Sequence, residues 1–360
     1  MASARAARKQ FSSGIWSTIS SVELTFLPGL RDVVADEVRE RVPAARRVRP
    51  VTGRADALLC EVPTLPPLLA LRTVVAPFLL LPFDVPRPKS LSSGEHLNRI
   101  VDAVKQAERL DGPLETFAVE AAGSDSPVFR RLAQQVSEAT GLTVDRGAAD
   151  CVLRFRRAVE GTGWDVLVRL TKRPLATRPW RVRGYPAAVN ATIAAAMVRL
   201  TEPTPQDRVL NLMCGSGTLL VERLLHSPAA KAVGVDRSGP ALAAAAANLE
   251  AAGLADRAVL HRADIADPVV EQPFDVVFAD PPWGDKMGRH DTNEKLHDLL
   301  LQRAHEISAE HARLAVLTHE IRVMERCLRT ASDLWQVRDE VRVFAKGHHP
   351  RIYVLDRNRG

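Results

Sequence analysis

The chain has 360 residues, of which 46% are hydrophobic and 26% are charged, and this length suffices for two or three packed domains. Its formal net charge of +6 and its pI of about 9.4 favour an anionic partner, although charge alone says nothing about fold. A membrane-spanning segment is not expected, because Arg72 and several prolines interrupt the most apolar stretch, residues 68–82.

Residues 1–20 are rich in Arg, Ser and Ala and contain no acid. They could imitate a transit peptide, but they lack the apolar core and the cleavage pattern of a secretory signal. We expect a disordered basic arm here.

The four cysteines (Cys60, Cys151, Cys214 and Cys327) are scattered without zinc-ligand spacing, which predicts no metal and a reducing, cytoplasmic location.

Basic side chains crowd residues 154–183. They form either a solvated face or, if the chain modifies a nucleic acid, a grip on phosphates whose binding would weaken steeply with salt. The candidates for RNA contact are Arg154, Arg156, Lys172, Arg173, Arg178, Arg181 and Arg183.

A glycine-rich turn follows the first strand of the second half. Residues 208–212 are a short apolar run, 213–218 read Met-Cys-Gly-Ser-Gly-Thr, and 219–225 form an amphipathic helical pattern. Gly215 and Gly217 let the backbone come close to a ligand. The turn is neither a Walker loop nor a complete dinucleotide fingerprint, whose third glycine is replaced by Leu220.

Acids end the next three predicted strands. Asp236 closes a strand about 20 residues after the glycine turn, where nucleoside-binding α/β folds place a ribose acceptor. A helix over residues 240–250 follows, then a strand that ends at Asp264 and a strand that leads to Asp280. Any one of these acids could instead cap a helix or form a turn. Together they predict a parallel sheet with a ligand over its carboxyl ends.

The segment Phe278-Ala279-Asp280-Pro281-Pro282-Trp283-Gly284 suits a planar, amine-bearing ring. A carboxylate and a free carbonyl can accept the hydrogens of the amine, and the indole can stack on the ring. The two prolines hold Asp280 and the Pro281 carbonyl in nearly one arrangement. The alternative is a strand-ending loop in which Asp280 caps and Trp283 packs.

Residues 211–218 together with Asp236, Asp264 and the Asp-Pro-Pro-Trp segment resemble the motifs of class I S-adenosylmethionine-dependent amino-methyltransferases. The Cys-Gly-Ser-Gly-Thr form is similar to that of the RNA guanine-N2 methyltransferases. Residues 183–197 resemble the stretch that helps these enzymes hold the methionine part of the cofactor, and residues 341–355 resemble their closing β-hairpin. Asn211 departs from the family, which usually has Asp there, and this puts recognition of the cofactor's ammonium group in doubt.

The first half resembles a THUMP RNA-binding domain preceded by a ferredoxin-like leader. The stretches that carry this likeness are 22–30 for the leader and 116–121, 126–132, 141–145, 151–155 and 165–170 for THUMP. The resemblance covers the chain from about residue 21 to its end, and THUMP-containing tRNA guanine-N2 methyltransferases are the family it implies. The expected fold class is α/β, with an α+β leader over 21–90, THUMP over 91–175, a linker with a cofactor-contacting helix over 176–205, and a Rossmann-like seven-stranded methyltransferase domain over 206–360.

The resemblance also implies roles for single residues. The catalytic set is Asp280, Pro281, Pro282 and Trp283. The S-adenosylmethionine-binding set is Asn190, Asn211, Cys214, Gly215, Ser216, Gly217, Thr218, Asp236, Arg237, Asp264, Ile265 and Asp280. The partner it implies is RNA, specifically tRNA, and a monomer is expected. Cys214 is not placed to attack a pyrimidine, which argues against C5 methylation through a covalent nucleophile.

Three alternatives remain open at this point. An adenine-N6 methyltransferase acting on DNA or RNA would use the same Asp-Pro-Pro-Trp logic. A ribosomal RNA guanine-N2 methyltransferase would have the same catalytic half. An RNA-binding protein with an inactive methyltransferase domain is the non-enzymatic alternative.

Overall fold

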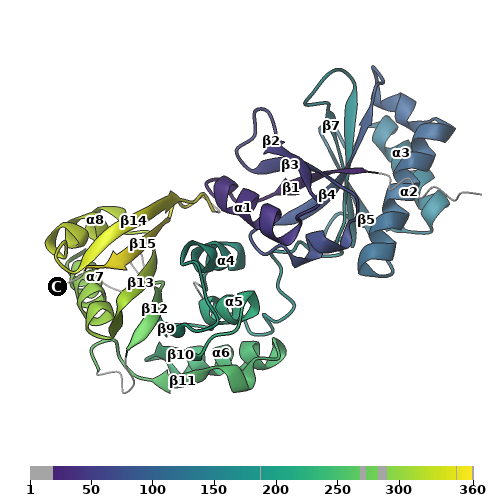
Figure 1. The fold of residues 1–360 in the computed structure, drawn as a ribbon. Helices are drawn as coiled ribbons and strands as arrows, with labels where there is room; N and C mark the ends of the chain where they lie inside the picture. Colours follow the sequence, from purple (N-terminus) through teal and green to yellow (C-terminus); the bar gives the residue numbers. More distant parts are fainter. Residues whose placement is uncertain (1–18, 187, 268–272, 283–289, 346, 359–360) are drawn as a thin grey trace, which may run out of the picture.

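The computed structural model describes residues 19–186, 188–267, 273–282, 290–345 and 347–358. Residues 1–18 of the expected arm and Trp283 lie outside these ranges. Figure 1 shows two bodies side by side, an N-terminal half and a C-terminal half, each built on its own sheet.

The N-terminal half contains an eight-stranded sheet in the order β2-β3-β1-β4-β8-β7-β5-β6. Its strands are β1 Ser20–Thr25, β2 Arg46–Pro50, β3 Ala57–Val62, β4 Ala76–Phe83, β5 Thr116–Ala121, β6 Thr143–Val144, β7 Cys151–Arg157 and β8 Trp164–Arg169. The short 3₁₀ helices η1 Pro66–Ala70 and η2 Pro88–Ser92 lie on either side of β4 in the sequence.

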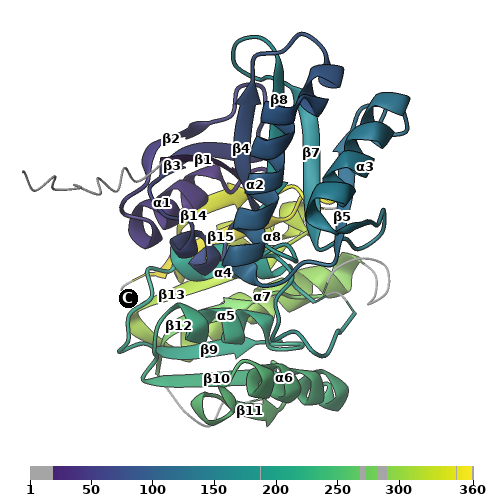
Figure 2. The same cartoon turned by 90° about the vertical axis from the view of Figure 1, so that its right-hand side faces the viewer.

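Three helices pack on one face of this sheet: α1 Arg31–Arg41, α2 Gly94–Asp111 and α3 Pro127–Thr140. Figure 2 shows α2 and α3 lying along that face, and their apolar sides share a core with every second residue of the strands. Local sequence sets the limits of α3, because Pro127 stands at its first turn and Gly141 ends it in the left-handed conformation at φ 77°.

The expected boundary between leader and THUMP, at residues 90 and 91, does not separate two sheets. β4 pairs with β1 on one side and with β8 on the other, both antiparallel. Because β4 belongs to the leader and β8 to the THUMP-like part, the two form one continuous sheet. Sequence stretches considered one at a time do not report such pairing.

The C-terminal half contains a seven-stranded sheet in the order β11-β10-β9-β12-β13-β15-β14, which confirms the expected Rossmann-like methyltransferase fold. Its strands are β9 Arg208–Leu212, β10 Lys231–Asp236, β11 Val259–Arg262, β12 Phe274–Ala279, β13 Ser308–Thr318, β14 Trp335–Arg342 and β15 Arg351–Arg357. β9 to β13 are parallel, whereas β15 runs antiparallel to both of its neighbours.

Helices cover both faces of this sheet, so its central strands are almost wholly apolar. The helices are α4 Ala191–Leu200, α5 Thr218–His226, α6 Gly239–Ala251, α7 His290–Glu306 and α8 Ile321–Thr330, and η3 spans Ala255–Arg257. One face packs on α4 and α5 in a core that continues into the N-terminal half, and the other packs on α7 and α8. Within the described ranges no helix is long and apolar enough to span a membrane.

Candidate active site

The glycine turn between β9 and α5 is bent by left-handed backbone at Met213, Gly215 and Gly217, with φ of 50°, 54° and 76°. Met213 is strained in this conformation, since a side chain rarely tolerates it, and such strain is typical of ligand-binding turns. A Cβ atom at Gly215 would meet nothing within 4 Å, so open space lies beside that residue. A Cβ at Gly217 would approach the Ala245 side chain to 3.1 Å, so Gly217 lets α6 pack close to the turn.

Asp236 holds this turn in place from the end of the neighbouring strand β10. One carboxylate oxygen accepts the backbone N–H of Gly215 at 2.8 Å, and the other accepts that of Ser238 at 2.8 Å. A carboxylate can accept about four hydrogen bonds, so both oxygens keep acceptor capacity for a ligand hydroxyl. The structure therefore brings the glycine turn and the predicted ribose acceptor together.

Asp264, Arg237 and Ile265 lie along the same edge of the sheet. Asp264 is half-buried; its Oδ1 accepts the backbone N–H of Ala266 at 3.1 Å, and its Oδ2 lies 3.8 Å from the Arg237 guanidinium. Ile265 is partly buried against the core shared with α7 and α8. All three stand beside the carboxyl ends of β10 and β11, where they were expected.

Asn211 and Cys214 are both buried next to the turn. The Asn211 amide donates to the carbonyls of Leu212 and Phe278, each at 3.2 Å, while its Oδ1 has no hydrogen-bond partner among the described residues. Buried acceptors are normally satisfied, so this oxygen is a candidate ligand contact. Cys214 packs against Gly234, where a Cβ would come within 3.2 Å of its sulfur, and burial raises the pKa of its thiol well above the ordinary value.

Asp280 follows the last residue of β12, directly before the buried Pro281 and the half-buried Pro282. Its Oδ1 atom is covered and has no hydrogen-bond partner within the described part of the chain. Burial alone raises the pKa of this carboxyl to about 7 from its ordinary 3.8, since removing a charge from water disfavours the ionised form. An acid at a sheet's carboxyl edge, with a raised pKa and a covered oxygen that has no partner among the described residues, is a functional candidate on physical grounds.

The segment before α4 folds over the glycine turn, and an asparagine that the sequence analysis missed holds it there. Asn248 is fully buried in the alanine-rich helix α6. Its Oδ1 accepts the backbone N–H of Arg183 at 3.0 Å, and its amide donates to the carbonyls of Arg183 at 3.2 Å and Ser216 at 3.0 Å. The signal in the sequence was a single amide within a run of alanines. Asn190 caps α4, with its Oδ1 accepting the Thr192 N–H at 2.9 Å.

Comparison with known proteins agrees with this geometry. Residues 178–351 match the model of the family UPF0020, described as RMKL-like, methyltransferase domain. The match covers just under half of the chain and shows that these residues form a methyltransferase domain. The expected class, an S-adenosylmethionine-dependent class I methyltransferase, is thereby confirmed.

Similar proteins extend the match beyond the methyltransferase domain. A tRNA (guanine(6)-N2)-methyltransferase of Archaeoglobus fulgidus is 24% identical over 88% of this chain and 87% of its own. A mouse U6 snRNA (guanine-N(2))-methyltransferase, THUMPD2, is 38% identical over 33% of this chain and 22% of its own. The crystal structure of TrmN from Thermus thermophilus superimposes with a TM-score of 0.69 at 24% identity, over 94% of this chain and 100% of that one. This last likeness shows a shared fold for both halves.

The arginines expected to contact RNA fall into two groups in the structure. Arg178 was expected to contact RNA, but it is buried and its guanidinium binds Glu222 at 2.7 Å inside the protein. Arg156 is likewise committed to the buried Glu23, at 2.6 Å. Arg181 donates from one nitrogen to Thr218 Oγ1 and the Val189 carbonyl, each at 2.9 Å, beside the glycine turn of the methyltransferase domain.

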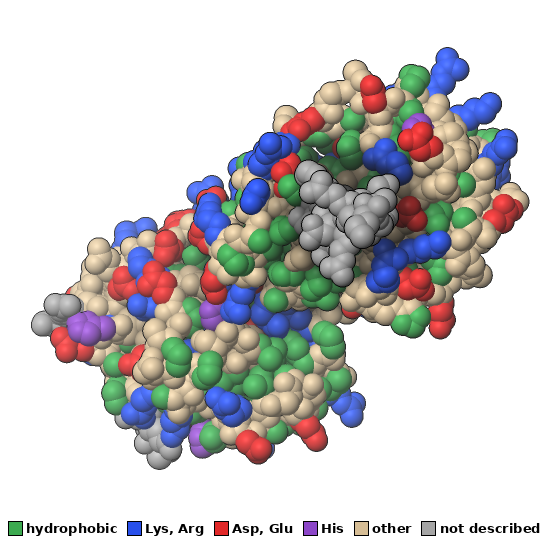
Figure 3. All heavy atoms as spheres, turned by 45° about the vertical axis from the view of Figure 1, so that its right-hand side comes forward, with side chains coloured by type: hydrophobic (Ala, Val, Ile, Leu, Met, Phe, Trp, Pro, Cys, Tyr) green, Lys and Arg blue, Asp and Glu red, His purple; other side chains and the backbone are tan. Residues whose placement is uncertain are grey.

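The remaining candidates are more accessible. Arg173 and Arg183 are exposed and Lys172 is half-buried. Arg154 lies over the Phe78 ring at 4.7 Å and binds Glu120 at 2.8 Å on the helix-free face of the sheet. Figure 3 shows Lys and Arg side chains spread over one face of the N-terminal half and reaching its junction with the methyltransferase domain.

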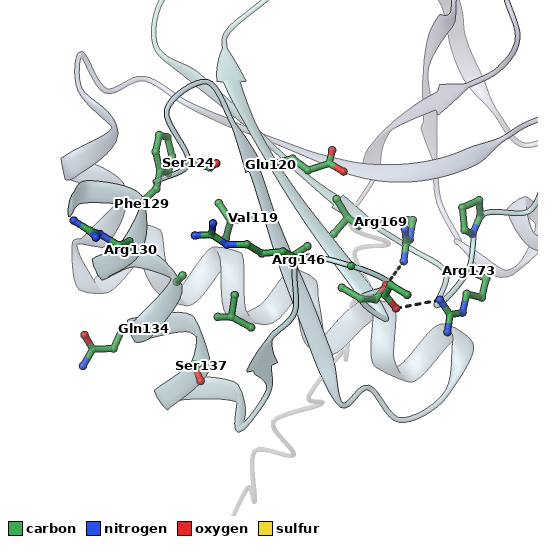
Figure 4. Close-up of a pocket in the computed structure, with 18 of the residues that line it drawn as sticks. Val119, Glu120, Ser124, Phe129, Arg130, Gln134, Ser137, Arg146, Arg169 and Arg173 are labelled. Carbon is green, nitrogen blue, oxygen red and sulfur yellow. Dashed lines mark hydrogen bonds between the residues drawn. The ribbon is translucent and has the colours of Figure 1, made fainter. Parts of the chain in front are cut away.

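A cavity of about 920 Å³ lies in the N-terminal half between α3, the outer part of β5 and the loop before β7 (Figure 4). Three exposed arginines line it: Arg130, Arg146 and Arg173. Arg173 and the buried Arg169 hold the loop, donating to the carbonyls of Ala148 at 3.0 Å and Ala149 at 2.7 Å. The sequence analysis missed Arg130 and Arg146, because their neighbourhood in space is not visible as a run of basic residues.

Proposed function

We propose that this protein transfers a methyl group from S-adenosylmethionine to the exocyclic N2 amine of a guanosine in tRNA. One observation carries the proposal: the covered Oδ1 of Asp280, which has no hydrogen-bond partner among the described residues, stands at the end of β12, next to the strand β9 that opens into the glycine turn. The guanine-N2 specificity in the names of similar proteins supports the choice of base and of RNA.

The residues present fit the cofactor. Gly215 leaves open space, Asp236 keeps acceptor capacity for ribose hydroxyls, and the orphaned Asn211 Oδ1 is a neutral acceptor suited to the ammonium group. Asn can accept this hydrogen bond as Asp does, although without the charge, so the departure from the family at this position is compatible with binding. When bound, the cofactor supplies an electrophilic methyl group.

The substrate side of the site must solve a different problem. The lone pair of an exocyclic guanine amine is delocalised into the ring, which makes the nitrogen a poor nucleophile. Asp280 and the Pro281 carbonyl can accept the two amine hydrogens, favouring a pyramidal nitrogen whose lone pair points away from both acceptors. Holding the amine in that orientation supplies most of the acceleration. The raised pKa of Asp280, about 7, also suits it to take a proton near neutral pH. Trp283 remains a predicted stacking partner for the flipped base.

The N-terminal half supplies the grip on RNA in this proposal. Its exposed Arg173 and the cavity that it shares with Arg130 and Arg146 offer positive charge to phosphates. We further propose that the protein acts as a monomer in the cytoplasm. All four cysteines are free and buried, which supports a reducing compartment.

The decisive experiment gives the protein labelled S-adenosylmethionine and separate pools of tRNA, ribosomal RNA and DNA, then identifies the labelled nucleoside. Label in methylguanosine from tRNA supports the proposal. Label only in ribosomal RNA favours the alternative substrate, and label only in methyladenosine or DNA refutes the choice of guanine.

A variant tests the role of Asp280 itself. Asp280→Ala should abolish methylation while S-adenosylhomocysteine still binds with nearly unchanged affinity, measured by calorimetry. Loss of both would make Asp280 a structural residue of the methyltransferase domain.

A further inference from the structure

A cluster of four charged side chains, three buried and one half-buried, joins the two halves of the molecule. At its centre is Glu222 of α5, which is fully buried. Each of its carboxylate oxygens binds a different arginine: Oε2 accepts from Arg72 Nε at 2.6 Å, and Oε1 accepts from Arg178 Nε at 2.7 Å. Arg72 comes from the loop after η1 of the N-terminal half and Arg178 from the linker, so one residue of the methyltransferase domain holds both.

The cluster continues to the first helix of the chain. Arg178 also donates to the carbonyl of Arg72 at 2.6 Å and to that of Leu175. Glu37 of α1, also buried, accepts the backbone N–H groups of Arg72 at 2.9 Å and Thr73 at 2.8 Å. Two acids and two arginines therefore balance in charge along an unbroken line from α1 through the linker to α5.

Other contacts fix the same interface at both ends. Arg199 of α4 binds Glu40 of α1 at 2.8 Å. Far from there, the Phe344 N–H donates to the Pro28 carbonyl at 3.0 Å, and a Cβ at Gly29 would lie 1.7 Å from the Arg342 carbonyl oxygen. The apolar core runs across the interface as well, from β1 to β15. The two halves are thus docked along the whole contact, which Figure 1 shows between α1 and α4.

Glu222 links this interface to the glycine turn, because α5 begins directly after that turn. Its first residue, Thr218, directly follows Gly217 of the glycine turn, so Glu222 lies about one helical turn from the turn that binds the cofactor. A shift of the N-terminal half would act on this helix through two arginines. The position of the N-terminal half is therefore fixed relative to the glycine turn through α5, and not only relative to the outer surface of the methyltransferase domain.

We propose that Glu222, together with Arg72 and Arg178, is a positioning device that holds the RNA-binding half at a fixed distance from the methyl-transfer site and so determines which nucleotide reaches Asp280. This inference rests on the proposed function. Glu222 is a positioning residue, since it lies in the interface between the halves and acts through α5. Removing one partner of a buried charge cluster leaves an uncompensated charge inside, which strongly loosens the contact.

The test compares Glu222→Gln with Glu40→Gln, a matched change at an exposed acid of the same interface. We expect Glu222→Gln to bind S-adenosylhomocysteine and full-length tRNA within about threefold of the unaltered protein. Its kcat on full-length tRNA should fall at least tenfold, and mass spectrometry of nuclease digests should find methylguanosine at more than one position. Glu40→Gln should keep the original rate and the single position.

A short RNA stem-loop that carries only the target guanosine separates positioning from general damage. Such an RNA does not engage the N-terminal half, so the unaltered protein and Glu222→Gln should methylate it at equal rates. If Glu222→Gln loses cofactor affinity and stem-loop methylation along with tRNA methylation, its role is structural and the proposal is overturned.

A second variant decides the matter if Glu222→Gln does not fold. Arg178→Lys keeps the buried charge but cannot make all the bonds of Arg178 to Glu222, Arg72 and Leu175 at once. We expect it to fold, to bind both ligands and to lose positional accuracy on tRNA. A folded Arg178→Lys protein with the original rate and one methylated position refutes the proposal. Failure of the proposed function is distinguishable, because then the unaltered protein itself would methylate no guanosine in tRNA.

Discussion

The Asp280 carboxyl should support methyl transfer but lower the free energy of unfolding. The Asp280→Asn variant separates the effect on activity from the effect on stability. Burial raises the pKa of this group from 3.8 to about 7. At about 1.4 kcal/mol per pKa unit, the ionised carboxylate costs the folded state about 4 kcal/mol at pH 8. Replacing it by a neutral amide of the same shape should recover up to that amount.

The sign and the pH window follow from proton binding. Below pH 4 the carboxyl is protonated in both the folded and the unfolded chain, so it costs nothing. Between pH 4 and 7 the folded state binds the additional proton, and the free energy of unfolding of the unaltered protein falls as pH rises. Above pH 7 the cost is complete and constant. The advantage of Asp280→Asn should therefore be about 4 kcal/mol at pH 8 and under about 2 kcal/mol at pH 5.

Urea unfolding followed by circular dichroism at pH 5, 6.5 and 8 measures this difference. Asp264→Asn is the control, since the Asp264 side chain is 44% exposed at the same edge of the sheet, and its effect should stay within about 0.5 kcal/mol at every pH. An Asp280→Asn protein that is less stable than the original, or equally stabilised at pH 5 and pH 8, would show that the carboxyl has a partner in the folded state. The reasoning would then be refuted.

Other perturbations test other parts of the structure. Gly29→Ala, at φ 100° and against the Arg342 carbonyl, should lower the thermal midpoint by several degrees, whereas Gly53→Ala, at φ 75° with nothing within 4 Å, should lower it less; equal shifts would contradict the docking contact. Asn248→Ala leaves the Ser216 carbonyl and both backbone groups of Arg183 without their buried partner, so calorimetry should show roughly 1–3 kcal/mol weaker S-adenosylhomocysteine binding; unchanged affinity would mean that the segment before α4 stays in place without it. The kcat/KM for RNA should fall as pH drops below about 7, where Asp280 gains its proton, and a rate that is flat down to pH 5 would rule out an ionised Asp280.

The methyltransferase half was largely predictable because its signals are local. A strand, a glycine turn and a helix follow one another within residues 208–226, and acids occur where each successive strand ends. Parallel strands bring these ends to one edge, so Asp236, Asp264 and Asp280 could be assigned to one site before any coordinates. The seven-stranded Rossmann-like sheet and the closing β-hairpin then followed from the family resemblance.

Charged residues at the interface could not be predicted in the same way. Arg178 stands in an arginine-rich stretch of the sequence, and only the fold shows that its guanidinium is buried against Glu222, 44 residues away. Arg72 meets the same carboxylate across 150 residues. Counting arginines therefore overstated the RNA-contacting set in the linker, while Arg130 and Arg146, which share one cavity, went unnoticed.

The buried polar atoms near the carboxyl edge explain why this site is open to a ligand. Asn248 and Glu222 are buried, and each has its hydrogen bonds within the protein, which fixes the helices and turns around them. Asn211 Oδ1 and Asp280 Oδ1 are buried too, but they lack partners among the described residues and stand on the adjacent strands β9 and β12. An unsatisfied buried acceptor costs about 1–3 kcal/mol, and a ligand that donates a hydrogen bond there gains that amount back. The two acceptors stand on paired strands, so a ligand or ligand pair that supplies a donor to each would remove both penalties.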